Sequence, residues 1–205
     1  MRRESSTVVV LAGEVSEELL DGLGRSPNVS VARAPAAGGG QPGEHTAARA
    51  GWEAGALAMR EAARRRSTYV IVPDDPLAEV AAAWRAMWDV TGGPGGAAGF
   101  EERAAEALAA WRDKRFELPD YYLVVPGAQA GGTGANMYLG PLRAVRPRRV
   151  AVAGMGGDSA LQQARLLEAL GSLQHGPWWP PLDELLGAAR RFNAAGLAET
   201  QPAPA

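Results

Sequence analysis

Short apolar runs alternate along the chain with longer segments in which apolar residues recur at helical spacing. The runs at residues 8–11, 29–31 and 69–72 are rich in valine and have the length of buried strands. After the first run, leucines at 19, 20 and 23 share one face of a helix that Ser16 is placed to cap. A second helical face between the other two runs consists of Trp52, Ala56, Met59 and Ala63.

The second half of the chain continues this alternation with one interruption. Helices are predicted near residues 77–90, 101–114 and 160–173, with a loop at 91–100. Three strand-like runs, at 121–125, 137–142 and 149–153, follow one another without a helix between them. A final helix is predicted after the prolines at 180 and 181.

Strands separated by helices indicate an α/β fold. We expect a three-layer Rossmann-like or flavodoxin-like domain with a largely parallel sheet of four or five strands. The run of strands at 121–153 favours a mixed sheet with an antiparallel excursion there. Residues 1–197 are expected to form this single domain, and residues 198–205 a disordered tail.

Composition narrows the function classes. The net charge of −2 disfavours nucleic acid as a partner, and we expect none. No apolar run approaches the length of a membrane span, so we expect no membrane association either. The chain has no cysteine, which favours a cytoplasmic location. Abundant alanine, glycine and arginine resemble the composition of actinobacterial proteins.

The scarcity of reactive side chains restricts the chemistry further. The chain offers no thiol, and its one lysine, Lys114, lacks the sequence context of a phosphate-binding P-loop. Only His45 and His175 provide imidazoles, and His175 is predicted at the end of a helix. Any catalysis would therefore use carboxylates, hydroxyls, arginines or backbone amides, and no cofactor or reaction follows from the sequence.

The stretch "VAVAGMGGDSALQQ" contains the first candidate ligand site. A strand, a glycine loop and a helix follow one another there, and amides at a helix N-terminus can bind a phosphate or carboxylate. The loop resembles the SGGxDS pyrophosphate loop of the ATP pyrophosphatases, with one residue fewer before the aspartate. The simpler interpretation is a turn with a capping box of Ser159 and Gln162. The residues of this candidate site are Gly154, Gly156, Gly157, Asp158 and Ser159.

Asp74 and Asp75 form the second candidate, because ligands of open α/β sheets collect where strands end. Together with Glu79, these carboxylates could hold Mg²⁺. The simpler interpretation assigns no metal: Asp75 is the N-cap of the next helix, and Pro76 is its first residue.

The stretch "HGPWWPP" contains the third candidate. The helix before it is expected to end near Leu173, and its prolines turn the chain into the last helix. Adjacent residues of an extended segment point in opposite directions, so one of Trp178 and Trp179 is expected to be buried and the other to form an interaction surface. A nearby basic run could grip a phosphate or an acidic partner, or form a solvated turn. It contains Arg143, Arg146, Arg148 and Arg149.

Two functions remain open from these candidates. The first is a non-catalytic domain that binds a protein partner or a second copy of itself through the Trp178–Trp179 corner and the last helix. The alternative is binding or turnover of a small anionic ligand, of nucleotide or phosphate type, at the 154–159 glycine loop and the Asp74–Asp75 turn. We slightly favour the first, because the chain is poor in catalytic residues and has six tryptophans.

Overall fold

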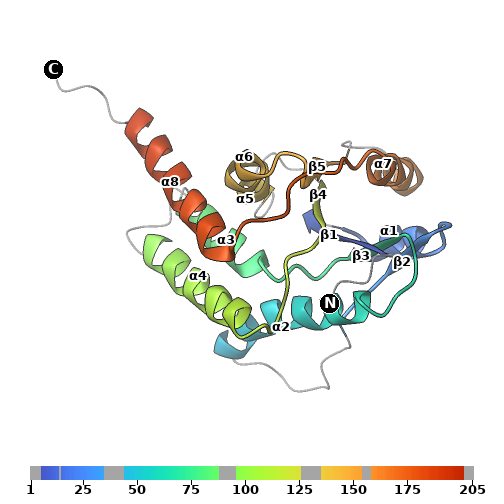
Figure 1. Cartoon of the computed structure of the whole chain (residues 1–205), viewed down its shortest axis with the longest axis horizontal. Coiled ribbons are helices and arrows are strands. Elements are labelled where there is room, and N and C mark those ends of the chain that lie inside the picture. Colours follow the sequence, from blue (N-terminus) through green and yellow to red (C-terminus); the bar gives the residue numbers. More distant parts are fainter. Residues whose placement is uncertain are drawn as a thin grey trace.

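A parallel sheet forms the centre of the fold (Figure 1). The computed structural model describes residues 6–13, 15–34, 44–87, 96–125, 135–153 and 158–200. Within these residues five strands pair in the order β2-β3-β1-β4-β5, and every pairing is parallel. The strands are β1 (Thr7–Gly13), β2 (Val29–Val31), β3 (Tyr69–Val72), β4 (Tyr121–Val125) and β5 (Val150–Val152).

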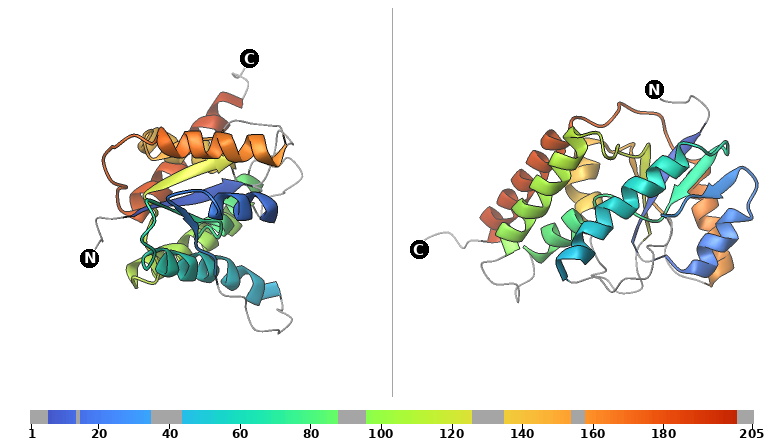
Figure 2. Two further views of the ribbon diagram at one scale, coloured as in Figure 1. Left: turned by 90° about the vertical axis from the view of Figure 1, so that its right-hand side faces the viewer. Right: turned by 90° about the horizontal axis from the view of Figure 1, so that it is seen from below.

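Helices cover both faces of the sheet. The left view of Figure 2 shows the strands between α7 on one side and α2 on the other. Helix α1 packs beside α7, and α4 packs beside α8 (Figure 2, right). The helical segments of the described residues are α1 (Glu17–Gly24), α2 (Glu44–Ala62), α3 (Ala78–Ala86), α4 (Gly96–Arg112), α5 (Ala135–Met137), η1 (Tyr138–Leu142), α6 (Arg143–Val145), α7 (Ser159–Gly171) and α8 (Leu182–Thr200).

Alternate residues of the central strand belong to different cores. Val10 faces the larger core, to which α2, α3, α4 and α8 contribute, whereas Val9 and Leu11 face α1 and α7. Because helices cover both faces, a strand in this sheet has no polar side. All five residues of β4 are buried, which explains why its sequence, "YYLVV", reads as a continuous apolar run.

The three-layer α/β prediction is confirmed, and so is the Ser16 cap, whose hydroxyl accepts a hydrogen bond of 3.2 Å from the Leu19 amide. The antiparallel excursion is not found in the described residues. Residues 137–142, predicted as a strand, are helical. Met137, Tyr138 and Leu142 are buried there at spacings of one and four residues, which suit a helical face. A short apolar run does not distinguish the two structures by itself.

Two further boundaries differ from the sequence predictions. Residues 96–100, assigned to a loop, form the first turns of α4, while 88–95 lie outside the described residues. The predicted tail begins at residue 198, but α8 extends to Thr200. Residues 201–205 lie outside the described residues, as does the side chain of His45.

Strands β1 and β4 are neighbours whose following helices cover opposite faces, which makes a topological switch point between them. The two backbones approach closely at this point. Gly13 has a φ of +132°, and a Cβ atom at this residue would lie 2.1 Å from the carbonyl oxygen of Val125. Only glycine satisfies both conditions, so Gly13 determines how closely the ends of β1 and β4 approach.

We expect Gly13→Ala to lower the free energy of unfolding by about 2 kcal/mol or more, because it adds a backbone clash to a left-handed conformation. Urea unfolding measures this loss. Gly99→Ala is the matched control: its Cβ would meet nothing within 4 Å, and alanine favours the interior of α4. Equal stability of the two variants would contradict the close approach of β1 and β4.

Candidate functional site

The first candidate site lies only partly within the described residues. Gly154, Gly156 and Gly157 lie outside them. Asp158 is the N-cap of α7, and its Oδ1 accepts a hydrogen bond of 2.9 Å from the Leu161 amide. The capping box predicted from Ser159 is therefore wrong by one residue, because α7 begins one residue earlier than expected: Asp158 supplies the capping oxygen, and Ser159 is the first residue of the helix.

Asp74 and Asp75 turn toward different partners. The Oδ2 atom of Asp74 accepts a hydrogen bond of 2.9 Å from the Ala34 amide, which connects the end of β3 to the end of β2. Asp75 turns inward and is 7% exposed. Its predicted role as the N-cap of α3 is wrong, because Leu77 occupies that position. Among the described residues, no group of three or more carboxylates or histidines could hold a metal ion.

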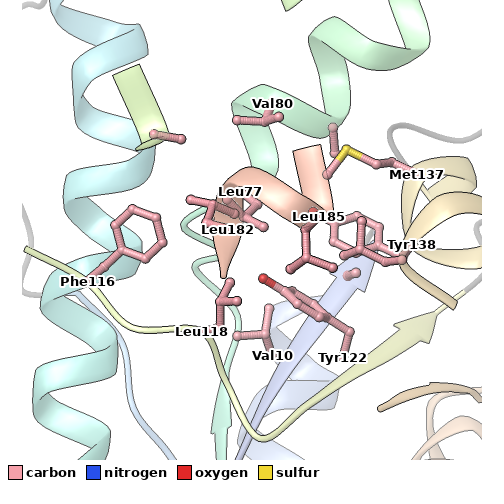
Figure 3. Close-up of a cluster of buried hydrophobic side chains, with 14 of the residues drawn as sticks. Val10, Leu77, Val80, Phe116, Leu118, Tyr122, Met137, Tyr138, Leu182 and Leu185 are labelled. Carbon is pink, nitrogen blue, oxygen red and sulfur yellow. The ribbon is translucent and has the colours of Figure 1, made fainter. Parts of the chain in front are cut away.

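Asp75 is the centre of a buried hydrogen-bonded cluster. Its Oδ1 accepts bonds from the Leu77 amide at 2.9 Å and from the Tyr122 hydroxyl at 3.4 Å, and the Tyr138 hydroxyl donates to Oδ2. The two tyrosine rings lie 4.9 Å apart. Figure 3 shows both rings among buried apolar side chains, close to Leu185. The cluster therefore joins the turn after β3 to β4 and to η1.

Burial dominates the electrostatics of this cluster. It raises the pKa of Asp75 from 3.8 to about 6, although the hydrogen bonds from Tyr138, Leu77 and Tyr122 act in the opposite direction. Burial, together with the charge of Asp75, raises the pKa of both tyrosines well above 10. The tyrosines therefore remain neutral donors, and the aspartate is the group that changes charge near neutral pH.

The pKa of Asp75 predicts a pH dependence of stability. Because the folded-state pKa lies above the unfolded value, the contribution of Asp75 is fully present below pH 3.8 and is lost as the pH rises through 6. The loss amounts to about 3 kcal/mol. Asp75→Asn should remove this part of the pH dependence.

Urea unfolding at pH 4.5, 6 and 7.5 measures the effect as the difference between wild type and Asp75→Asn. Tyr138→Phe serves as a second variant. It removes a bond that lowers the aspartate pKa, so its loss of stability should extend to higher pH. Parallel pH profiles for wild type and Asp75→Asn would rule out the raised pKa.

The tryptophan pair lies at the other edge of the sheet, where the chain passes from α7 to α8 around the amino ends of β4 and β5. The expected division of the pair is confirmed: Trp179 is 5% exposed and Trp178 is 36% exposed. The Nε1 atom of Trp179 donates to the Pro119 carbonyl at 2.8 Å, and its ring meets Tyr122 edge-on at 5.8 Å. Trp179 thereby anchors the corner in the larger core.

Arginines bind the backbone of this corner. Arg149 donates through Nε to Pro177 at 3.1 Å and through Nη2 to Gly176 at 2.7 Å. The Nε of Arg146 donates to the Trp178 carbonyl at 2.6 Å. We call residues 146–149 and the carbonyls of 175–178 the arginine clasp. The fourth carbonyl is that of His175, which accepts a hydrogen bond from Arg148. His175 is exposed and lies four residues after α7 ends, not at the helix end as predicted.

The guanidinium of Arg149 also lies between two rings, 5.0 Å from the centre of Tyr121 and 4.8 Å from that of Trp178. Its Nη1 donates to the Asp120 carbonyl at 3.1 Å, at the start of β4. One side chain thus connects the sheet edge, the corner and the exposed tryptophan. The clasp directs its donors to the protein's own carbonyls, so the basic run is part of the corner rather than a solvated turn.

Replacement of Arg149 tests the clasp. We expect Arg149→Lys to cost about 2 kcal/mol of unfolding free energy, because an ammonium cannot reproduce three directed bonds or stack between two rings. Arg148→Lys is the control, since Arg148 donates one bond of 3.3 Å, to the His175 carbonyl, and its loss should cost less than about 1 kcal/mol. Thermal unfolding measures both, and equal losses would contradict the clasp.

A groove of about 510 Å³ borders the corner, between the end of α4 and the start of α8. We call it the Trp–Pro groove. One wall of the groove is formed by Trp178, whose side chain is partly exposed. Its lining consists of Trp111, Glu117, Leu118, Trp178, Trp179, Pro180 and Pro181.

Sequence reasoning missed the tyrosine cluster, because Asp75 lies 47 and 63 residues from Tyr122 and Tyr138 in the chain. It also missed Trp111 in this groove, because the tryptophan pair that Trp111 faces begins 67 residues later. The one available hint was at Tyr122, which places a hydroxyl on a strand that otherwise has the apolar character of a buried strand.

Comparisons with protein-family models, with curated proteins and with solved structures gave no match to this chain. In the described part of the chain, no helix combines the length and the apolar character needed to cross a membrane. The assignment of this protein to the three-layer α/β class therefore rests on its structure alone.

Proposed function

We propose that this protein is a non-catalytic interaction domain that binds a proline-containing segment of another protein in the Trp–Pro groove. The main support for this proposal is the exposure of Trp178, which remains 36% exposed. Arg146 binds its backbone carbonyl, and Arg149 lies over its ring. An exposed tryptophan beside an apolar groove is typical of a binding surface, because tryptophan is enriched among the residues that dominate interface energies.

Contacts within the protein restrict the lining of the groove before any partner binds. Pro180 and Pro181 restrict the backbone on one side, and Trp179 is fixed by its bond to the Pro119 carbonyl. Arg149 stacks on the Trp178 ring. A preorganised surface loses little conformational entropy on binding, so even a small apolar contact can give measurable affinity.

The lining favours a particular partner. Aromatic-lined grooves bind extended polyproline II segments, whose conformation is already restricted. Among the described lining residues, Glu117 alone carries a charge. A proline-containing segment with a neighbouring arginine or lysine therefore complements this groove in both shape and charge.

The groove supports the interaction hypothesis better than the glycine loop supports its alternative. Asp158, the charged residue of that loop, caps α7 and has the same sign as the anionic ligand that the alternative requires. The cytoplasmic location favoured by the lack of cysteine is part of the interaction proposal.

Synthetic peptides test the proposal. We expect a peptide with two Pro-x-x-Pro repeats and a flanking arginine to bind, whereas versions with alanine for proline or glutamate for arginine should bind more weakly. Isothermal titration calorimetry measures affinity, and Trp178→Ala should reduce it about tenfold or more. Leu161→Ala is the matched control, because it shortens a 45% exposed apolar side chain on α7, on the other face of the sheet.

Two outcomes would overturn the proposal. One is equal affinity of wild type and Trp178→Ala for the arginine-containing peptide. The other is a dimer in light scattering that Trp178→Ala converts to a monomer without peptide binding by either protein, which would assign the groove to a second copy of the chain.

A further inference from the structure

A second cavity, of about 690 Å³, lies at the amino end of the sheet, between the end of α2 and the segment that connects α4 to β4. We call it the basic cavity. Val8 and Asp120 line it where β1 and β4 begin. Its volume falls in the range of small-molecule sites. The five cationic residues of its lining are Arg60, Arg64, Arg65, Lys114 and Arg115, against two carboxylates, Glu117 and Asp120.

Hydrogen bonds and ion pairs position the arginine side chains around the cavity. The Nη2 of Arg60 donates to the Arg115 carbonyl at 3.1 Å, which joins α2 to the opposite wall. Arg65 and Arg64 both pair with Glu61, at 3.0 and 3.6 Å. Arg115 pairs with Glu53 at 3.8 Å and lies over the Trp52 ring. The side chains of these ion pairs are all more than a third exposed. Such exposed pairs are weak, so an arginine can exchange its partner for a ligand at low cost. The carboxylate of Asp120 accepts from the Val8 amide at 2.8 Å, which engages one of its oxygens.

Lys114 has a left-handed backbone conformation, which favours glycine over lysine. Its φ is +57°. The Lys114 amide bonds to the Trp111 carbonyl and the Arg115 amide to the Ala110 carbonyl, a pattern that ends α4 in a Schellman motif. The left-handed residue of this motif is usually glycine. In the described part of the chain no ion pair joins Lys114 to a carboxylate. Neither backbone conformation nor an internal ion pair therefore accounts for this lysine.

We propose that the basic cavity binds a small phosphorylated compound that carries an apolar or aromatic group, with Lys114 as a contact to the phosphate. The guanidinium groups offer forked donors and the ammonium a point charge, which together suit a phosphate dianion. Met59, Phe116 and Leu118 line the same cavity and supply apolar contact for the remainder of the ligand. This site is separate from the Trp–Pro groove, although Glu117 and Leu118 border both.

Phenyl phosphate is a suitable probe, because it combines both features of the proposed ligand. Thermal shift and isothermal titration calorimetry are carried out on the full chain with phenyl phosphate, inorganic phosphate and phenol. We expect phenyl phosphate to raise Tm more than either of its parts at equal concentration.

Lys114→Gly provides the decisive variant. Glycine suits the left-handed position, so the ligand-free variant should melt at the wild-type Tm or about 2–4 °C higher, while its affinity for phenyl phosphate falls about tenfold. Lys114→Arg should keep most of the affinity because it retains the charge. Arg112→Gln removes an exposed charge at the end of α4 outside the cavity lining and should leave binding unchanged.

No Tm shift with phenyl phosphate, or equal affinity of wild type and Lys114→Gly, would overturn the proposal. Binding of the proline peptide is measured on the same variants and should not respond to Lys114→Gly. A failure of the basic cavity is thus distinguished from a failure of the groove.

Discussion

The last two helices of this protein cover opposite faces of a parallel sheet, and the chain between them must pass around the amino ends of β4 and β5. Both faces of such a sheet require cover, because its strands are apolar on both sides. The connecting residues 172–181 lie outside the sheet, so their backbone carbonyls must bond to groups outside the sheet, such as side chains or water. The arginine clasp supplies such side chains at residues 175–178, from a basic run that lies immediately before β5.

This constraint explains the composition of the corner. Prolines need no amide partner, and Trp179 anchors the segment in the core while Trp178 closes over Arg149. The Trp–Pro groove follows from the same arrangement, because fixing Trp179 and the two prolines leaves their outer surfaces beside Trp111. A structural requirement and a binding surface therefore share one set of residues, and the binding proposal depends on the rigidity of the clasp.

Local signals explain which parts of the fold could be predicted from the sequence. The valine-rich runs, the Ser16 cap and the unequal burial of Trp178 and Trp179 depend on residues within a few positions of one another, and the structure confirms them. Residues 137–142 were assigned wrongly, because a short apolar run suits a helix and a strand equally.

Long-range contacts account for the features that sequence reasoning missed. An aspartate before a proline is typical of a helix start, whereas the bonds from Tyr122 and Tyr138 that hold the Asp75 carboxylate in the core come from 47 and 63 residues away. The clasp likewise joins arginines to carbonyls 27 to 32 residues later. The basic cavity combines three separate segments, and Lys114 carries no sequence signal of its left-handed conformation.

The clasp can be observed directly through the side-chain N–H of Arg149. In nitrogen-15 NMR spectra, the Arg149 Nε–H signal should exchange slowly with water and show cross-relaxation to the Trp178 ring, because this group donates to the Pro177 carbonyl and its guanidinium lies over the ring. An Arg149 signal that exchanges as fast as that of exposed Arg112, with no contact to Trp178, would show that the clasp does not form.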